Sequence, residues 1–442
     1  MKKRLLVAAL LPLFAASMLR AETVNLRQAW QYALQNDPTW QVAQADAGYE
    51  RAEQGKALAG LLPSLSFSAS RYKNELDRQG ASNNPTRYDS SVDAWSLRQP
   101  LIRFQNIADY KRTVAHSEAA DFTLSAAAQQ LTVRVAQAYF DALLTEDQLR
   151  LARFLVASLE AQQDAASKSF RSGAGTRIEI DEAASRLAIA VSEVLATENL
   201  LANARQKLAA LLGVDVTGIV ALDEKRLSAL QLAPADFAAW RDLVLQTNPE
   251  LQAAGKSIDE TAWTVNRARA GHLPTVDLVV TKSRSESETV STVNSRYDLN
   301  SAGVQLNVPI FAGGYVNAET TQARARHQRA QAVYEGIRRD LETRVQKEFN
   351  GIMQGRERLN SLNQALLASQ VALKSTRRGV EAGTRNTLDV LNAERQVYNM
   401  QLELSRSRHE FVMSRLRLKA MANMLDEEEI LLISSLLNST AP

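Results

Sequence analysis

The sequence predicts an α+β membrane protein built by tandem duplication, in which the strands of a shared β-barrel continue into long helical hairpins. Three observations lead to this fold class. A pattern of prolines occurs twice, two very long segments contain mostly helix-forming residues, and short segments next to the prolines alternate between apolar and polar residues.

The prolines indicate the duplication. Proline fixes φ and has no backbone donor, so it stands where helices and strands begin or end. The first set is spaced by 25 and 37 residues and the second by 25 and 35: Pro38, Pro63 and Pro100, then Pro249, Pro274 and Pro309. The surrounding sequences are also similar, for example 134–139 with 344–349 and 175–181 with 383–389. We predict one unit over 22–235, a second over 236–424, and a C-terminal segment over 425–442.

The first 21 residues have the pattern of a secretory signal peptide, with a short membrane anchor as the alternative. Lys2, Lys3 and Arg4 precede an apolar stretch that is too short to span a bilayer, and Ala21 offers a cleavage site. Cleavage there would leave 48 basic and 49 acidic residues, so the high pI does not indicate nucleic-acid binding. The lack of cysteine excludes disulfides and a lipid-modified cysteine. No other segment has enough consecutive apolar residues for a transmembrane helix.

Two segments predict unusually long helices. Residues 105–172 contain no glycine or proline, and residues 315–378 contain no proline. At 1.5 Å per residue, each gives a rod of roughly 100 Å. A second helical stretch follows each rod after a short break, so we predict antiparallel hairpins over 104–211 and 313–424. Composition alone would also suit a stalk or a fibre.

Four short segments, 64–72, 91–101, 275–283 and 299–309, alternate in the manner of barrel strands. A soluble sandwich would alternate too, but it would not explain the rods or the signal peptide. The polar insertions 73–90 and 284–298 are expected to be external loops. Four strands cannot close a barrel, and lipid does not tolerate open edges. Two chains would give eight strands around a filled interior, whereas three would give twelve around a passage.

The chain resembles the TolC-like outer-membrane efflux proteins over nearly its whole mature length. The segments that carry the resemblance are 271–278, 308–317, 382–385, 389–393 and 425–431. The resemblance implies a homotrimer with a twelve-stranded barrel in the outer membrane of a Gram-negative cell, in contact with its lipid, and a helical tunnel through the periplasm. It also implies docking, through a periplasmic adaptor protein, to an inner-membrane ABC or RND pump. Residues 212–240 and those after 424 would form a belt around the tunnel.

The two hairpin turns hold the candidate site residues. In the simplest interpretation, glycine ends one helix and an acidic residue favours the start of the next. The resemblance implies that Asp389 lines a periplasmic constriction, with Asn392 where the family has a second aspartate. It also implies that Arg385 tethers the hairpin to Asp181, while Val380 replaces a tyrosine that supports this tether. The residues expected to dock the adaptor are Gly175, Thr176, Arg177, Gly383 and Thr384.

Nothing in the sequence indicates catalysis. The four histidines lack metal-ligand spacing, and Gly313–Gly314 lacks the Lys-Ser/Thr of a phosphate loop. We therefore expect no catalytic residue, no metal, no cofactor and no nucleic-acid partner. The expected function is a passive exit duct for type I protein secretion, multidrug efflux or both. The alternatives are an outlet dedicated to one drug or metal pump, and a non-conducting trimeric coiled-coil scaffold or adhesin.

Overall fold

The computed structural model describes residues 22–76, 86–221 and 232–435, so the predicted signal peptide lies outside the described residues. The first half contains β1 (Glu22–Val24), α1 (Leu26–Asn36), α2 (Pro38–Ala59), β2 (Ser64–Leu76), β3 (Thr86–Ile102), α3 (Phe104–Arg171), α4 (Arg177–Leu212) and β4 (Val216–Ile219). The second half contains α5 (Phe237–Thr247), α6 (Pro249–Arg269), η2 (Ala270–His272), β5 (Thr275–Glu286), η3 (Val290–Thr292), β6 (Arg296–Asn307), α7 (Tyr315–Glu381), α8 (Thr387–Met421) and α9 (Glu427–Ser435).

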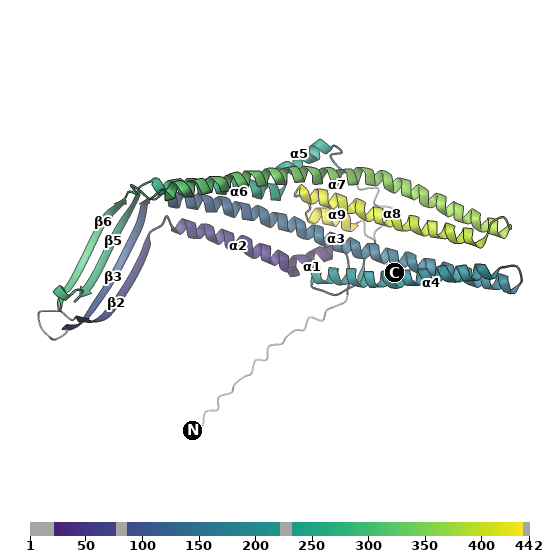
Figure 1. Cartoon of the computed structure of the whole chain (residues 1–442), viewed down its shortest axis with the longest axis horizontal. Helices are drawn as coiled ribbons and strands as arrows, with labels where there is room; N and C mark the ends of the chain where they lie inside the picture. The colour runs from purple at the N-terminus through teal and green to yellow at the C-terminus, as the bar shows by residue number, and fades with distance from the viewer. Residues whose placement is uncertain (1–21, 77–85, 222–231, 436–442) are drawn as a thin grey trace, which may run out of the picture.

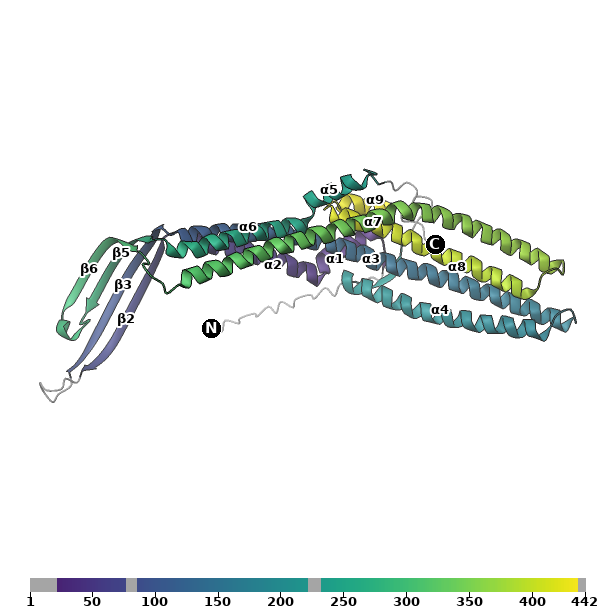
Figure 2. The ribbon, with the colours of Figure 1, turned by 45° about the horizontal axis from the view of Figure 1, so that its top comes forward.

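The molecule is elongated, with a β-sheet at one end and two hairpin turns at the other (Figures 1 and 2). The helices α3 and α7 have 68 and 67 residues, which corresponds to roughly 100 Å each. In the half of the molecule near the turns, the helices lie side by side in the order α7, α8, α3, α4. The chain therefore combines a four-stranded sheet at one end with two helical hairpins that lie side by side at the other.

The sheet is antiparallel, with the strand order β2-β3-β5-β6. Cross-strand partners such as Phe67 and Trp95, or Leu278 and Val304, share one face. Phe67, Trp95 and Val304 are all at least half exposed on that face. The sheet therefore presents an apolar surface to its surroundings, as a barrel wall in lipid does.

The strands are longer than predicted. Residues 73–76, 86–90, 284–286 and 296–298 belong to strands, although we expected them in external loops. The physical reason is charge pairing across the ladder. Three ion pairs join residues that lie directly opposite each other on neighbouring strands. Their N–O distances are 2.9 Å for Arg87–Glu75, 2.7 Å for Arg284–Asp298 and 2.9 Å for Arg296–Glu286. Polar residues thus extend the strands beyond the apolar zone.

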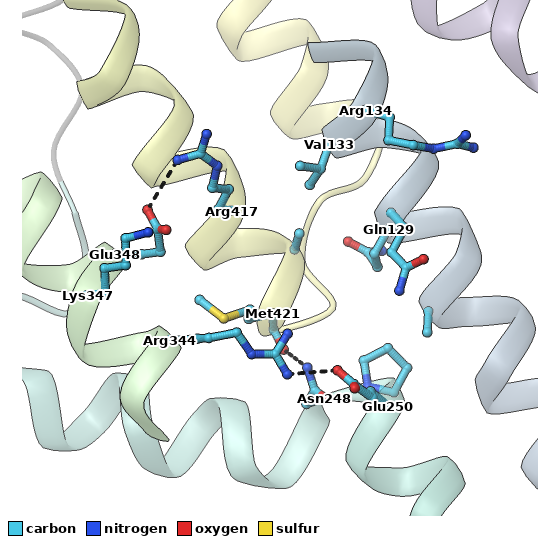
Figure 3. Close-up of a pocket in the computed structure, with 14 residues that line it drawn as sticks. Gln129, Val133, Arg134, Asn248, Glu250, Arg344, Lys347, Glu348, Arg417 and Met421 are labelled. Atoms are coloured by element: carbon cyan, nitrogen blue, oxygen red, sulfur yellow. Dashed lines mark hydrogen bonds and ion pairs between the residues drawn. The ribbon is translucent and has the colours of Figure 1, made fainter. Parts of the chain in front are cut away.

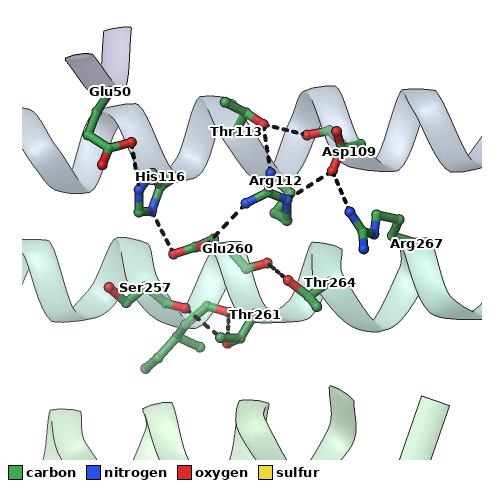
Figure 4. Close-up of polar contacts among 11 residues, drawn as sticks. Glu50, Asp109, Arg112, Thr113, His116, Ser257, Glu260, Thr261, Thr264 and Arg267 are labelled. Carbon is green, nitrogen blue, oxygen red and sulfur yellow. Dashed lines mark hydrogen bonds and ion pairs between the residues drawn. The ribbon is translucent and has the colours of Figure 1, made fainter. Parts of the chain in front are cut away.

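Between the sheet and the middle of the molecule, polar contacts join α2, α3 and α6 (Figure 4). The ring of His116 on α3 contacts Glu50 of α2 at 2.8 Å and Glu260 of α6 at 3.0 Å. Two turns earlier on α3, the Asp109 carboxylate accepts a hydrogen bond from Arg267 of α6 at 3.0 Å. These contacts fix the order of the three helices where apolar packing is sparse.

The main hydrophobic core lies midway along the helices, where α1, α5 and α9 lie against the long rods (Figure 1). Trp240, Tyr139, Phe140 and Met413 are almost completely buried there. The strands β1 and β4 pair in parallel beside this core. The C-terminal helix α9 is attached through Glu429, which Arg415 bonds at 2.8 Å with both side chains 7% exposed. Segments from both ends of the chain thus gather around the middle of the rods.

Candidate functional site at the hairpin tips

The two hairpin turns share one backbone design. Gly173 and Gly383 adopt positive φ angles of 77° and 72°, which glycine tolerates without strain. Their amides donate to the carbonyls of Phe170 and Val380, both at 3.0 Å. Each turn therefore ends its first helix through a left-handed glycine.

The second helix of each hairpin begins with the same reciprocal cap. In the first tip, the Thr176 side chain accepts from the Glu179 amide at 3.3 Å, and the Glu179 carboxylate accepts from the Thr176 amide at 3.0 Å. In the second tip, Asn386 and Asp389 exchange the corresponding bonds at 2.9 and 3.3 Å. Asp389 thus has a capping role within its own chain.

This geometry corrects the predicted alignment of the two tips. The sequence alignment placed Gly175-Thr176-Arg177 opposite Gly383-Thr384-Arg385, and Asp181 opposite Asp389. The positive-φ glycines and the caps instead equate Gly173 with Gly383 and Glu179 with Asp389. The sequence alignment is wrong because the similar Gly-Thr-Arg segments occupy positions in the two turns that differ by two residues. Glu179 is therefore the counterpart of Asp389.

Within a single chain, Arg385 and Asp181 each pair inside their own hairpin tip. Arg385 lies 3.7 Å from Asp389, and Arg177 lies 3.1 Å from Asp181. An Arg385–Asp181 contact is not formed inside the chain, so a tether between neighbouring chains stays a prediction. Asn392 accepts a hydrogen bond from Arg186 of α4 at 2.9 Å, a contact that the sequence did not reveal.

The first and second hairpins are also joined farther from the tips. Glu193 on α4 accepts from Arg395 at 2.9 Å and from the Tyr398 hydroxyl at 2.8 Å, and both partners lie on α8. The Arg395 guanidinium lies 5.0 Å from the centre of the Tyr398 ring. Burial and the hydrogen bond to Glu193 raise the pKa of Tyr398 to about 12, so the phenol stays protonated and donates. Sequence reasoning missed this cluster, although Arg395 and Tyr398 share a helix face at the i, i+3 spacing.

A cavity of about 650 Å³ separates the hairpins between this cluster and the tips. Its lining includes Gln162, Glu179, Val380 and Arg385. Glu394 also lines it; its side chain is 5% exposed and pairs with Arg377 at 2.5 Å. The hairpins are thus in close contact at the cluster and apart near the tips.

A second cavity, of about 430 Å³, lies in the middle of the molecule between α3, α6, α7 and α8 (Figure 3). Arg344 donates to Glu250 at 2.9 Å, and the Asn248 amide donates to the Met421 carbonyl at 2.9 Å. Arg417 lies 3.9 Å from Glu348. Because these charges compensate one another, we interpret this cavity as a joint between helices. Among the described residues, no group of three or more His, Asp or Glu side chains is placed to hold a metal ion.

Two segments of the chain, 29–214 and 240–424, match the family model described as outer membrane efflux protein. The chain belongs to the outer membrane efflux protein family. Like the two predicted units, the two matches to this family occupy the two halves of the chain. Membership confirms the predicted fold class and the outer-membrane localisation, and it identifies an export channel.

Relatives within the efflux protein family cover almost the whole chain. The alkaline protease secretion protein AprF of Pseudomonas aeruginosa is 31% identical over 424 residues, covering 94% of this chain and 88% of AprF. The proteases secretion protein PrtF of Dickeya chrysanthemi is 30% identical over 446 residues, covering 98% and 95%. The outer membrane protein TolC of Escherichia coli is 26% identical over 455 residues, covering 99% and 90%.

Solved structures show the same fold. The CusC channel superposes with a TM-score of 0.80 at 18% identity, covering 90% of this chain and 92% of CusC. The VceC protein of Vibrio cholerae superposes with a TM-score of 0.78 at 20% identity, covering 91% and 97%. At these identities the superpositions support the architecture.

Proposed function

We propose that this chain forms, as a homotrimer, the outer-membrane exit duct of a type I protein secretion system. The observation that carries the duct is the four-stranded sheet with two free edges and one exposed apolar face, continuing into two long helical hairpins. Secretion is favoured over efflux because AprF and PrtF, both named for protease secretion, are 31% and 30% identical over almost the whole chain. The duct is passive and has no catalytic role.

The free edges support the trimer. Within the described part of the chain, β2 and β6 each have one partner strand and one unpaired side. An unpaired edge in lipid leaves backbone groups without hydrogen bonds, so β2 of one copy pairs with β6 of the next. Three copies contribute twelve strands, which leave room for a passage.

The outer helices of the bundle support the same arrangement. The helices α4 and α7 flank the set of four and expose large apolar side chains: Ile189, Leu195 and Leu200 on α4, and Leu367 and Val371 on α7. By length and composition, α4 is the one described helix that could cross a membrane. This helix lies beside α3 at the end of the molecule away from the sheet, which is outside the membrane in the proposed trimer. We therefore assign its exposed apolar side chains to packing against α7 of the neighbouring copy.

In this trimer the tips form the periplasmic opening. Three copies of Asp389 make a negative collar, and Arg385 reaches Asp181 of the neighbouring copy. The turn residues Gly175, Thr176, Arg177, Gly383 and Thr384 dock a periplasmic adaptor that links the duct to an inner-membrane pump. A runner-up function, an outlet dedicated to one efflux pump, is supported by the similarity to the outer membrane efflux protein BepC of Brucella suis, which is 24% identical over 288 residues.

Three experiments test the proposal. Light scattering of the mature protein in detergent should give the mass of a trimer, and planar bilayers should show single-channel currents; a monodisperse monomer would refute the duct. Deleting the gene should remove proteins from the culture medium while drug susceptibility stays unchanged. The reverse pattern would favour the dedicated efflux outlet.

A further inference from the structure

Glu193 joins the two hairpins of one chain through two hydrogen bonds. Its carboxylate uses both oxygens, Oε2 for Arg395 at 2.9 Å and Oε1 for Tyr398 at 2.8 Å. Two bonds from successive turns of α8 restrict both the sliding and the rotation of that helix against α4. Hydrogen bonds to a carboxylate are also stronger than neutral ones, especially where water is partly excluded.

Apolar contacts surround this polar connection. Leu155 and Leu159 of α3, Ala190 of α4 and Leu391 of α8 form a buried cluster with Tyr398, whose side chain is 5% exposed. The Arg186–Asn392 bond lies one to two turns closer to the tips. The contact between the hairpins is therefore compact, and Glu193 lies at its edge.

Beyond Asn392, the contact between the hairpins becomes weak. The cavity of about 650 Å³ opens there, and the described residues form one further hydrogen bond between the hairpins, from Thr387 to Glu179 at 3.5 Å. A bond of that length contributes little. The position of the α7/α8 tip therefore depends on the contacts just behind it, which are the single Arg186–Asn392 bond and the two bonds of Glu193.

We infer that Glu193 is a positioning residue that holds the α7/α8 hairpin against the α3/α4 hairpin and thereby sets the width of the ring of tips. This inference rests on the proposed function, because the ring exists only in the assembled duct. It concerns a bond inside one chain, and it is separate from the Arg385–Asp181 tether between chains.

The width of the ring can be measured without any transport. The chain has no cysteine, so Ala382→Cys introduces a unique site for a spin label on the exposed second tip. In a symmetric trimer, one label per chain gives a single distance between copies. Glu193→Gln keeps the shape of the side chain but loses the charge and one of its two acceptors. We expect the distance distribution to broaden toward larger values, with a roughly tenfold larger open fraction, because one charged bond shifts a two-state balance by about that factor.

Glu198→Gln is the matched control. Glu198 lies on the same helix, but its partner Arg153, at 2.7 Å, is on α3 of the same hairpin. This variant should leave the distance unchanged. Exchanging the charges gives a second test: Glu193→Arg alone should widen the ring, and adding Arg395→Glu should narrow it again.

The outcomes distinguish the positioning role of Glu193 from the assembly of the duct. An unchanged distance in Glu193→Gln, or equal widening in Glu198→Gln, would refute the positioning role while the trimer stands. If the labelled protein without further substitutions gave no spin–spin distance between copies, both the trimer and the positioning role of Glu193 would be refuted. A several-fold rise in bilayer conductance in Glu193→Gln, but not in Glu198→Gln, would support the positioning role by an independent measurement.

Discussion

The two halves of the chain build the same joint with different chemistry. By a joint we mean the place where the start of one helix meets the end of another helix in space. In the first half, the start of α2 lies next to the end of α4, and the Asn36 side chain donates to the Leu212 carbonyl at 2.8 Å. In the second half, α6 begins where α8 ends, and Asn248 donates to the Met421 carbonyl at 2.9 Å. Each joint also places a proline at the first position of the new helix. The backbone of the joint is thus the same in both halves.

The difference lies in the residue that caps the new helix. Asp37 caps α2 with a carboxylate that is 3% exposed, and Arg134 donates to it at 3.1 Å. Asn248 caps α6 with a neutral amide, and the corresponding arginine, Arg344, bonds the half-exposed Glu250 at 2.9 Å. One half therefore keeps its charge pair partly buried, and the other keeps it near solvent. The comparison indicates that the joint tolerates either arrangement as long as both the cap and the helix end are satisfied.

The largest expected difference between the halves concerns the core beside each joint. Nine residues before the proline, the second half buries Trp240 completely, with its indole N–H bonded to the Pro234 carbonyl at 2.7 Å, whereas the first half has Ala29. Trp240→Ala should lower the free energy of unfolding by about 3–5 kcal/mol, because a large cavity remains. Chemical denaturation in detergent measures this loss. Trp30 is the partly exposed neighbour of Ala29, so Trp30→Ala should lower the free energy of unfolding by clearly less. Equal losses in the two variants would contradict the comparison.

The two arginines of the joints should differ next. Arg134→Met leaves the carboxylate of Asp37 buried without its cation, so we expect a loss of about 1–3 kcal/mol. Arg344→Met leaves Glu250 free to contact water, so the loss should be below about 1 kcal/mol. The two variants can be compared in one denaturant series. A larger loss for Arg344→Met would show that burial of the carboxylate does not decide the cost.

Acid should affect the first joint more than the second. Burial acts to raise the pKa of Asp37, but hydrogen bonds from Thr39 and Trp40 and the charge of Arg134 outweigh it, so the pKa lies below 3.8. A lowered folded-state pKa stabilises the protein above the ordinary value, and that stability is lost as the pH falls through the lower one. Asp37→Asn should therefore reduce the drop in unfolding free energy between about pH 5 and about pH 3. Asn248→Asp should increase it. Parallel pH profiles for all three proteins would contradict this assignment.

The smallest effect on stability is expected at the tips. Glu179→Ala and Asp389→Ala each remove one half of a capping box, which costs about 1 kcal/mol or less. Only Asp389→Ala should also reduce cation selectivity in bilayers and weaken block by trivalent hexamminecobalt, because Asp389 forms the collar in the proposed trimer. If both variants changed selectivity equally, the collar would include the first tip as well.

The sequence was sufficient for the fold class because its strongest signals are local. Proline spacing and helical composition predicted the rods, and α3 begins and ends within one residue of the predicted 105–172. The strand ends were wrong because charged pairs such as Glu75–Arg87 extend the ladder without alternation. The contact of Glu193 with Arg395 could not be predicted, because it depends on which faces of two helices, about 200 residues apart in the chain, meet after folding.

The length of α8 determines what the bond at Glu193 can control. The core holds the far end of this helix near Met421, and Arg395 lies 26 residues away, or about 39 Å along the axis. At that radius, each ångström of displacement corresponds to about 1.5° of tilt. A hydrogen bond fails when stretched by less than about 1 Å. The helix thus acts as a long lever, and the bonds at Glu193 limit its angular movement to about one or two degrees.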